Sequence, residues 1–230
     1  MSIDADADDD TNLIHFYVNG YVDPTSKLQW IPIVKNGTNF LRYHLITIGW
    51  QSKQIPLINE DILRFSIIRD PYERFISGVV EELEMYIDLQ DKTFCDLVFN
   101  RNYCELFLKF LFDKVLLESS NFLGEHTTLQ INLLKIATDN SLDLYDSSRI
   151  CYFKMNDKLG YQINHWLKTY DIQNTINNGK INSKSVNDSR LLKLVQEFLF
   201  DYKNNKYKEK IYNYLEPDYI FFNNAKFINE

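Results

Sequence analysis

The chain has 230 residues, of which 45% are hydrophobic and 15% aromatic, and it carries a formal net charge of −7. This length suits one sizeable core, and the hydrophobic content excludes an intrinsically disordered protein. The acidic balance argues against a nucleic-acid-binding protein held by bulk charge, so any anion-binding site must be built locally.

The N-terminal segment 1–11 is acidic and is predicted to be a disordered tail before a single domain over 12–230. The tail has no basic region and no apolar run, and the chain has no apolar run of the roughly 18 residues that a membrane span needs. Three cysteines, Cys95, Cys104 and Cys151, have no metal-ligand spacing and form no complete disulfide framework. We therefore expect a cytoplasmic protein with no signal peptide, no membrane contact, reduced cysteines and no metal.

The first predicted elements are short strands. Residues 13–18 form a strand candidate, and Asn19-Gly20 after it is a strong signal for a hairpin turn. Residues 28–34 form a second strand candidate, in which Pro32 favours an interrupted or edge position. The domain is therefore expected to open with a small hairpin.

A loop suited to phosphate follows this second strand, with the sequence Lys35-Asn36-Gly37-Thr38-Asn39. Apolar residues at helical spacing come next, so the order is strand, loop and helix. A glycine permits a tight turn, consecutive backbone N–H groups can form a concave anion site, and the lysine adds a point charge. The loop is not a Walker A loop, because the GxxxxGK[ST] pattern is absent.

A further strand is predicted over 64–69, and a helix begins directly after it at Pro71. Asp70 supplies an N-cap carboxylate, Pro71 occupies the first helical position, and Glu73 is placed to complete a capping box. These three residues predict the start of the helix from local chemistry alone.

Three polar side chains around this helix start are expected to point away from the core: Arg69, Arg74 and Ser77. An arginine beside a helix N-terminus can bind an anion, because its guanidinium group binds phosphate bidentately and the helix end carries partial positive charge. The alternative is an ordinary capped helix with a surface arginine.

The pattern Arg69-Asp70-Pro71, followed by Arg74 and Ser77, resembles the 3′-phosphate-binding segment of sulfotransferases that use PAPS (3′-phosphoadenosine 5′-phosphosulfate). The Golgi-type carbohydrate branch of that family is the most similar. The resemblance implies that Arg69 and Ser77 hold the 3′-phosphate of the nucleotide.

The loop at 35–39 likewise resembles the family's 5′-phosphosulfate loop when it is aligned on Lys35 and Gly37. Val34 stands where the family has a proline, and Asn39 replaces a hydroxyl residue. An alignment on Thr38, Asn39 and Arg42 instead would place Lys35 one position away from the family's lysine. The alignment on the lysine is preferred because it keeps the only cation of the loop.

The resemblance covers about 29–221 and implies an α/β fold of three layers, similar to P-loop proteins, with a central parallel β-sheet flanked by helices. The strands near 29–34, 64–69 and 149–154 are expected to lie in that sheet. Both anion-binding segments would then lie at the carboxyl ends of neighbouring strands, as one nucleotide with two anionic ends requires.

Residues 126–130 resemble the His-x-x-x-Gln loop that carbohydrate sulfotransferases place across the active site, which implies that His126 is the general base. A lone loop histidine is more often a surface residue, and Glu125 and Glu60 are the next candidates. Lys184, in a polar loop over 171–187, is a further candidate for a phosphate contact.

The resemblance implies sulfuryl transfer from PAPS to a hydroxyl, or an amine, of an acceptor that is a carbohydrate or small molecule. Lys35 would stabilise charge on the departing nucleotide PAP (3′,5′-adenosine bisphosphate), and no metal is required. Two other functions stay open: a nucleotide-binding, kinase-like enzyme, and a non-catalytic binding protein with the sulfotransferase fold.

Overall fold

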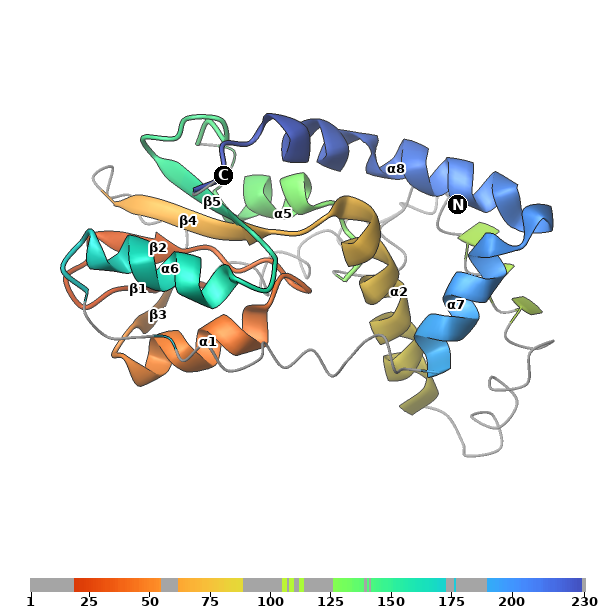
Figure 1. Ribbon diagram of the computed structural model, residues 1–230, viewed down its shortest axis with the longest axis horizontal. Coiled ribbons are helices and arrows are strands. Elements are labelled where there is room, and N and C mark those ends of the chain that lie inside the picture. Colours follow the sequence, from red (N-terminus) through yellow and green to blue (C-terminus); the bar gives the residue numbers. More distant parts are fainter. Residues whose placement is uncertain are drawn as a thin grey trace, which may run out of the picture.

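The computed structural model describes residues 19–54, 62–88, 105–106, 108–109, 112–113, 126–138, 140, 142–172, 176 and 190–228 (Figure 1). Several predictions fall outside these residues: the tail over 1–11, the strand over 13–18, and the candidates Glu60, Glu125 and Lys184.

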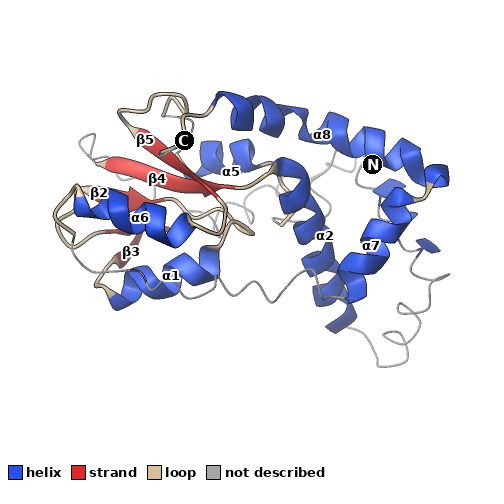
Figure 2. Ribbon diagram, viewed as in Figure 1, coloured by secondary structure: helices blue, strands red, loops and turns tan. Residues whose placement is uncertain are grey.

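Five strands form one mixed sheet in the order β3-β1-β2-β4-β5 (Figure 2). The strands are β1 Asn19–Val22, β2 Leu28–Trp30, β3 Gln51–Gln54, β4 Leu63–Ile68 and β5 Ile150–Lys154. β2, β4 and β5 run parallel, as predicted for the strands near 29–34, 64–69 and 149–154. β1 is antiparallel to both β2 and β3, so the expectation of a parallel sheet is wrong at this edge.

The hairpin predicted at Asn19-Gly20 is wrong, since both residues lie inside β1. The turn instead follows β1, where the Asp23 carboxylate accepts hydrogen bonds from the backbone N–H groups of Lys27 (2.7 Å) and Leu28 (2.6 Å). A side chain that satisfies its own turn in this way outweighs the local preference of Asn-Gly. A connection this short joins antiparallel strands, which explains the mixed edge of the sheet.

Helices cover both faces of the sheet (Figure 1). The described helices are α1 Thr38–Thr47, α2 Pro71–Asp88, α5 Gln130–Ala137, α6 Leu159–Lys168, α7 Arg190–Phe200 and α8 Asn205–Asn224, with a 3-10 helix η2 over Tyr202–Asn204. α1 and α6 pack on the face that carries Phe65 and Ile67, and α5 and α8 pack on the face that carries Ile68. Successive strand residues point to opposite faces, so β4 contributes to both cores.

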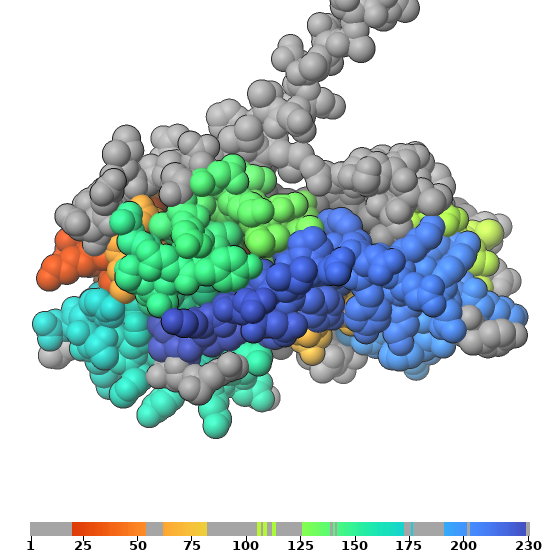
Figure 3. All heavy atoms as spheres, turned by 90° about the horizontal axis from the view of Figure 1, so that it is seen from above, coloured from red at the N-terminus to blue at the C-terminus, as the bar shows by residue number. Residues whose placement is uncertain are grey.

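A third core lies among helices beyond the end of the sheet. Phe75 and Val79 of α2 pack there with Val195 of α7 and Ile211 of α8. Figure 3 shows α8, in blue, running along the molecule from the sheet region to this helical region. α8 therefore holds the two parts of the fold together. In the part of the chain that the structure describes, no helix has the length and apolarity to cross a membrane.

Candidate functional site

The two segments predicted to bind anions meet at one edge of the sheet. Lys35 follows β2 and Arg69 follows β4, and these strands are parallel neighbours that pair Trp30 with Phe65. The carboxyl ends of parallel neighbours lie together, and ligands of α/β proteins bind at this edge. The predicted juxtaposition of the two segments is therefore present.

Lys35 is constrained through its backbone and its side chain. Its φ of 66° lies in the left-handed region, which a non-glycine residue rarely adopts, and Gly37 follows with a φ of 74°. The Lys35 ammonium lies 2.6 Å from an Oε2 of Glu81 on α2, with side-chain exposures of 17% and 40%. The loop thus directs its only cation onto α2.

Asn36 is buried and bonded to three segments of the fold. Its backbone N–H donates to the carbonyl oxygen of Ile33 (3.2 Å), and its Nδ2 donates to the carbonyl oxygen of Ile67 (2.7 Å) and to Oε1 of Gln130 (2.7 Å). The backbone N–H and the side-chain amide of Asn36 both donate to groups inside the protein, so Asn36 fixes the conformation of the loop.

The remaining loop residues form the start of α1. Gly37 is the N-cap and provides no side-chain hydrogen bond, Thr38 donates its hydroxyl to the carbonyl oxygen of Ile33 (2.6 Å), and Asn39 is exposed. The first N–H groups of a helix have no acceptor within it, and they carry the positive end of the helix dipole. This helix end can therefore receive an anion beside Lys35.

The helix start predicted at Asp70-Pro71 is confirmed. The Asp70 Oδ1 accepts the backbone N–H of Glu73 (3.0 Å), and α2 begins at Pro71. The side chain of Arg69 is 19% exposed, and its Nε lies 3.6 Å from Oε2 of Glu73. Gln130 fixes the Arg69 backbone by accepting its N–H (3.1 Å) and donating to its carbonyl oxygen (3.0 Å).

Ser77 lies between the two cations on one face of α2. Glu73, Ser77 and Glu81 are spaced four residues apart, which places them in one row along the helix. Glu73 contacts Arg69 and Glu81 contacts Lys35. With a rise of 1.5 Å per residue, these two contacts are roughly 12 Å apart along the helix axis. Ser77 is only 8% exposed, so the expectation that its side chain points away from the core is wrong.

The expectation that Arg74 points away from the core is wrong, because Arg74 is 1% exposed. Its Nε donates to the carbonyl oxygen of Val34 (3.1 Å), and its NH1 donates to that of Thr128 (2.7 Å). Buried carbonyl groups need donors, and the guanidinium group supplies them across two chain segments. Arg74 thus connects the residue before Lys35 to the segment that follows His126.

His126 lies directly on α2. A Cβ atom at Gly78 would overlap the His126 carbonyl oxygen, so only glycine allows this close approach. Gly78 precedes Glu81 by three residues, and these positions are neighbours on the helix surface. The His126 backbone and the Lys35 ammonium therefore contact adjacent parts of α2.

The segment after His126 is fixed by α8. The buried Asp218 carboxylate accepts the N–H groups of Gln130 (2.8 Å) and Ile131 (2.9 Å) at the start of α5. Burial raises the pKa of Asp218, while these hydrogen bonds and the charge of Arg74 act in the opposite direction. Tyr214 of α8 also lies within hydrogen-bond distance (3.2 Å) of the Thr127 carbonyl oxygen.

Sequence reasoning missed three residues of this arrangement: Glu81, Gln130 and Asp218. Gln130 is the last residue of the segment that resembles the His-x-x-x-Gln loop, so that motif could have indicated it. Glu81 carries no local signal, because it acts on a segment distant in the sequence. Asp218 lies in an aromatic-rich segment whose pattern indicates docking on a core, but that pattern does not identify the N–H groups that its carboxylate accepts.

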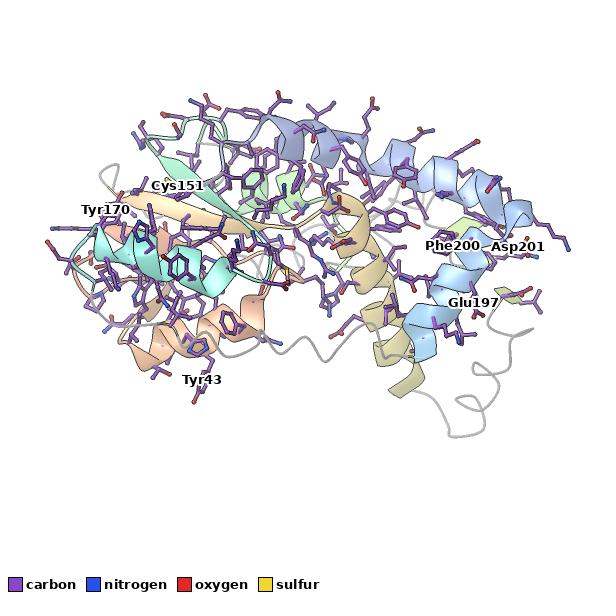
Figure 4. All side chains as sticks on the ribbon, viewed as in Figure 1. Tyr43, Cys151, Tyr170, Glu197, Phe200 and Asp201 are labelled. Carbon is purple, nitrogen blue, oxygen red and sulfur yellow. The ribbon has the colours of Figure 1, made fainter. Side chains whose placement is uncertain are left out.

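Cys151 of β5 lies near the amino-terminal end of its strand, away from this site (Figure 4). It is half-buried and forms no disulfide, and burial raises the pKa of its thiol. Within the described residues no group of three His, Cys, Asp or Glu side chains could hold a metal ion.

Comparisons of the chain with protein-family models, with curated proteins and with solved structures give no match.

Proposed function

We propose that the chain is a PAPS-dependent sulfotransferase with a three-layer, P-loop-like fold. It transfers the sulfuryl group to a hydroxyl or an amine of an acceptor, a carbohydrate or another small molecule. The observation that carries the proposal is the common edge of β2 and β4, where Lys35 and Arg69 both lie against one face of α2.

The residues present fit a nucleotide with two phosphate groups. Lys35 and Arg69 each lie beside a carboxylate oxygen, so each cation is placed where it can pair with an anionic oxygen. Arg69 and Ser77 would hold the 3′-phosphate. Lys35 and the N–H groups at the start of α1, from Thr38 and Asn39, would hold the 5′ end.

PAPS supplies the activated sulfuryl group. Lys35 stabilises the negative charge that develops on the oxygen leaving with the nucleotide, where a fixed charge has the largest effect on rate. His126 takes the proton of the acceptor. Arg69 and Ser77 position the donor without touching the reacting atoms, so they act mainly on binding.

The test is the affinity for PAP, measured by calorimetry. Arg69→Ala should weaken PAP binding about 10-fold or more, the effect of losing charge-assisted hydrogen bonds, and should leave 5′-AMP binding unchanged. Lys193→Ala is the matched control, because Lys193 also pairs with a glutamate four residues later, on α7. Unchanged PAP affinity in a folded Arg69→Ala protein would refute the 3′-phosphate assignment.

A second candidate function is a non-catalytic protein that binds the nucleotide or a protein partner. Two observations favour it: Lys35 is ion-paired with Glu81, and the donors of Asn36 are used internally. Transfer of labelled sulfate from PAPS to a panel of acceptors separates the two functions, since binding without turnover supports the second. Tighter binding of ATP than of PAP would instead favour a kinase-like enzyme.

A further inference from the structure

We propose that Glu81 is a built-in competitor for the 5′ end of the nucleotide, and that it makes the site select ligands with two anionic ends. This inference rests on the proposed function. Glu81 is ion-paired with the Lys35 ammonium, and a 5′-phosphate group has to displace its carboxylate to reach the lysine.

The ion pair is well placed for this role. Its 2.6 Å separation is that of a close, charge-assisted hydrogen bond, and the Lys35 side chain is only 17% exposed. Salt and water screen such a partly buried pair less than a surface pair.

A phosphate bound to Lys35 would lie close to Glu81, so the two negative charges would repel each other. A ligand with only a 5′-phosphate meets this repulsion with no other strong contact. A ligand already held at its 3′-phosphate by Arg69 presents its 5′ end at high effective concentration. The competition therefore penalises most those ligands whose only phosphate is at the 5′ position.

Among the residues that the structure describes, the 3′ end of the site has no equivalent competitor. Glu73 is 66% exposed, and its Oε2 lies 3.6 Å from the Arg69 Nε, so water screens this pair. Glu73 and Glu81 occupy the same face of α2, two turns apart, but differ in separation and exposure. This asymmetry makes Glu73 a matched control for Glu81.

The experiment compares Glu81→Gln and Glu73→Gln with the wild type, using calorimetry at low ionic strength with PAP, 5′-AMP and 3′-AMP. Glu81→Gln should bind 5′-AMP about 3- to 10-fold more tightly, PAP more tightly by a smaller factor because its 3′-phosphate holds it in either protein, and 3′-AMP unchanged. Glu73→Gln should change all three affinities less than about twofold. The gain in Glu81→Gln should shrink as salt is added.

The outcomes separate the inference from the proposed function. PAP binding by the wild type, with no gain for 5′-phosphate ligands in Glu81→Gln, overturns the inference and leaves the function standing. An equal gain for all three ligands also overturns it, because that would be a general effect of charge. If Glu81→Gln binds PAP and neither the wild type nor Glu73→Gln does, the result supports the inference. No PAP binding by any of the folded proteins rejects the proposed function and the inference with it.

Discussion

At the scale of single residues, the site depends on a few residues whose conformation is fixed by buried hydrogen bonds. Lys35 adopts a left-handed backbone between Ile33 and Gly37, while Asn36 anchors the loop to β4 and α5. Non-glycine residues in this region of φ cost about 1–3 kcal/mol and persist only where the surroundings fix them. The buried amide of Asn36 is such a constraint, because it is bonded to two distant segments.

The proposed chemistry assigns different roles to Lys35 and His126, and their variants separate these roles. Lys35→Ala should lower kcat by about 10²-fold or more with a smaller effect on PAP affinity, because its best contact forms in the transition state. His126→Ala should lower kcat by ~10²–10⁴-fold, and the rise of the wild-type rate with pH through an imidazole-like pKa should disappear. The measurement is the pH dependence of kcat for all three proteins. A His126→Ala enzyme with near-wild-type activity and an unchanged pH profile would remove His126 from the mechanism and leave the nucleotide site unaffected.

At the scale of elements, α2 is the surface on which the site is assembled. It begins at a local cap, buries Phe75 and Val79 in the helical core, and presents Glu73, Ser77 and Glu81 in one row. Its contact with the His126 segment is made at Gly78. The His126 segment can therefore lie this close to α2 only because residue 78 is a glycine.

Gly78→Ala tests this contact. The added methyl group would overlap the His126 carbonyl oxygen, which is backbone and can move only with its segment. Crowding of this kind costs about 1–3 kcal/mol and exceeds the helix propensity that alanine gains over glycine. Urea denaturation should therefore show net destabilisation, whereas Glu73→Ala, at an exposed position of the same helix, should change stability by less than about 1 kcal/mol. A more stable Gly78→Ala protein would show that the contact is absent.

At the scale of the whole molecule, α8 connects regions that are far apart in the sequence. It packs in the helical core through Ile211 and on the sheet through Phe221, and between them Asp218 caps the start of α5. The buried carboxylate of Asp218 thus supports Gln130, and through it the backbone of Arg69.

This cap predicts a pH-dependent contribution to stability. The pKa of Asp218 is raised by burial, so the folded state binds its proton more tightly than the unfolded state does. Proton binding by Asp218 therefore stabilises the folded state. This stabilisation is complete below the ordinary aspartate pKa of about 4 and declines as pH rises through the raised pKa of Asp218. The difference in unfolding free energy between wild type and Asp218→Asn should therefore fall as pH rises from about 4 towards 7, since other carboxylates titrate alike in both proteins. The measurement is chemical denaturation across that range. A difference that grows with pH would contradict the raised pKa.

The elements whose signals are local can be predicted from the sequence. Asp70-Pro71 fixes the start of α2 through a cap between residues three apart, and the apolar runs around Phe65 and Phe153 indicate buried parallel strands. The order of the strand, the Lys35 loop and the Arg69 segment also predicted that both cations lie at one edge of the sheet, because parallel strands align their carboxyl ends.

The partners of these residues depend on how the chain packs and could not be predicted from local patterns. Asn19-Gly20 became strand because Asp23 closes the turn a few residues later, and Arg74 turned inward because two distant carbonyl groups need its donors. The contacts of Lys35 with Glu81 and of Gln130 with Asp218 join segments 46 and 88 residues apart. A linear sequence carries no local pattern for such pairs, since their geometry exists only once the core has packed the segments together.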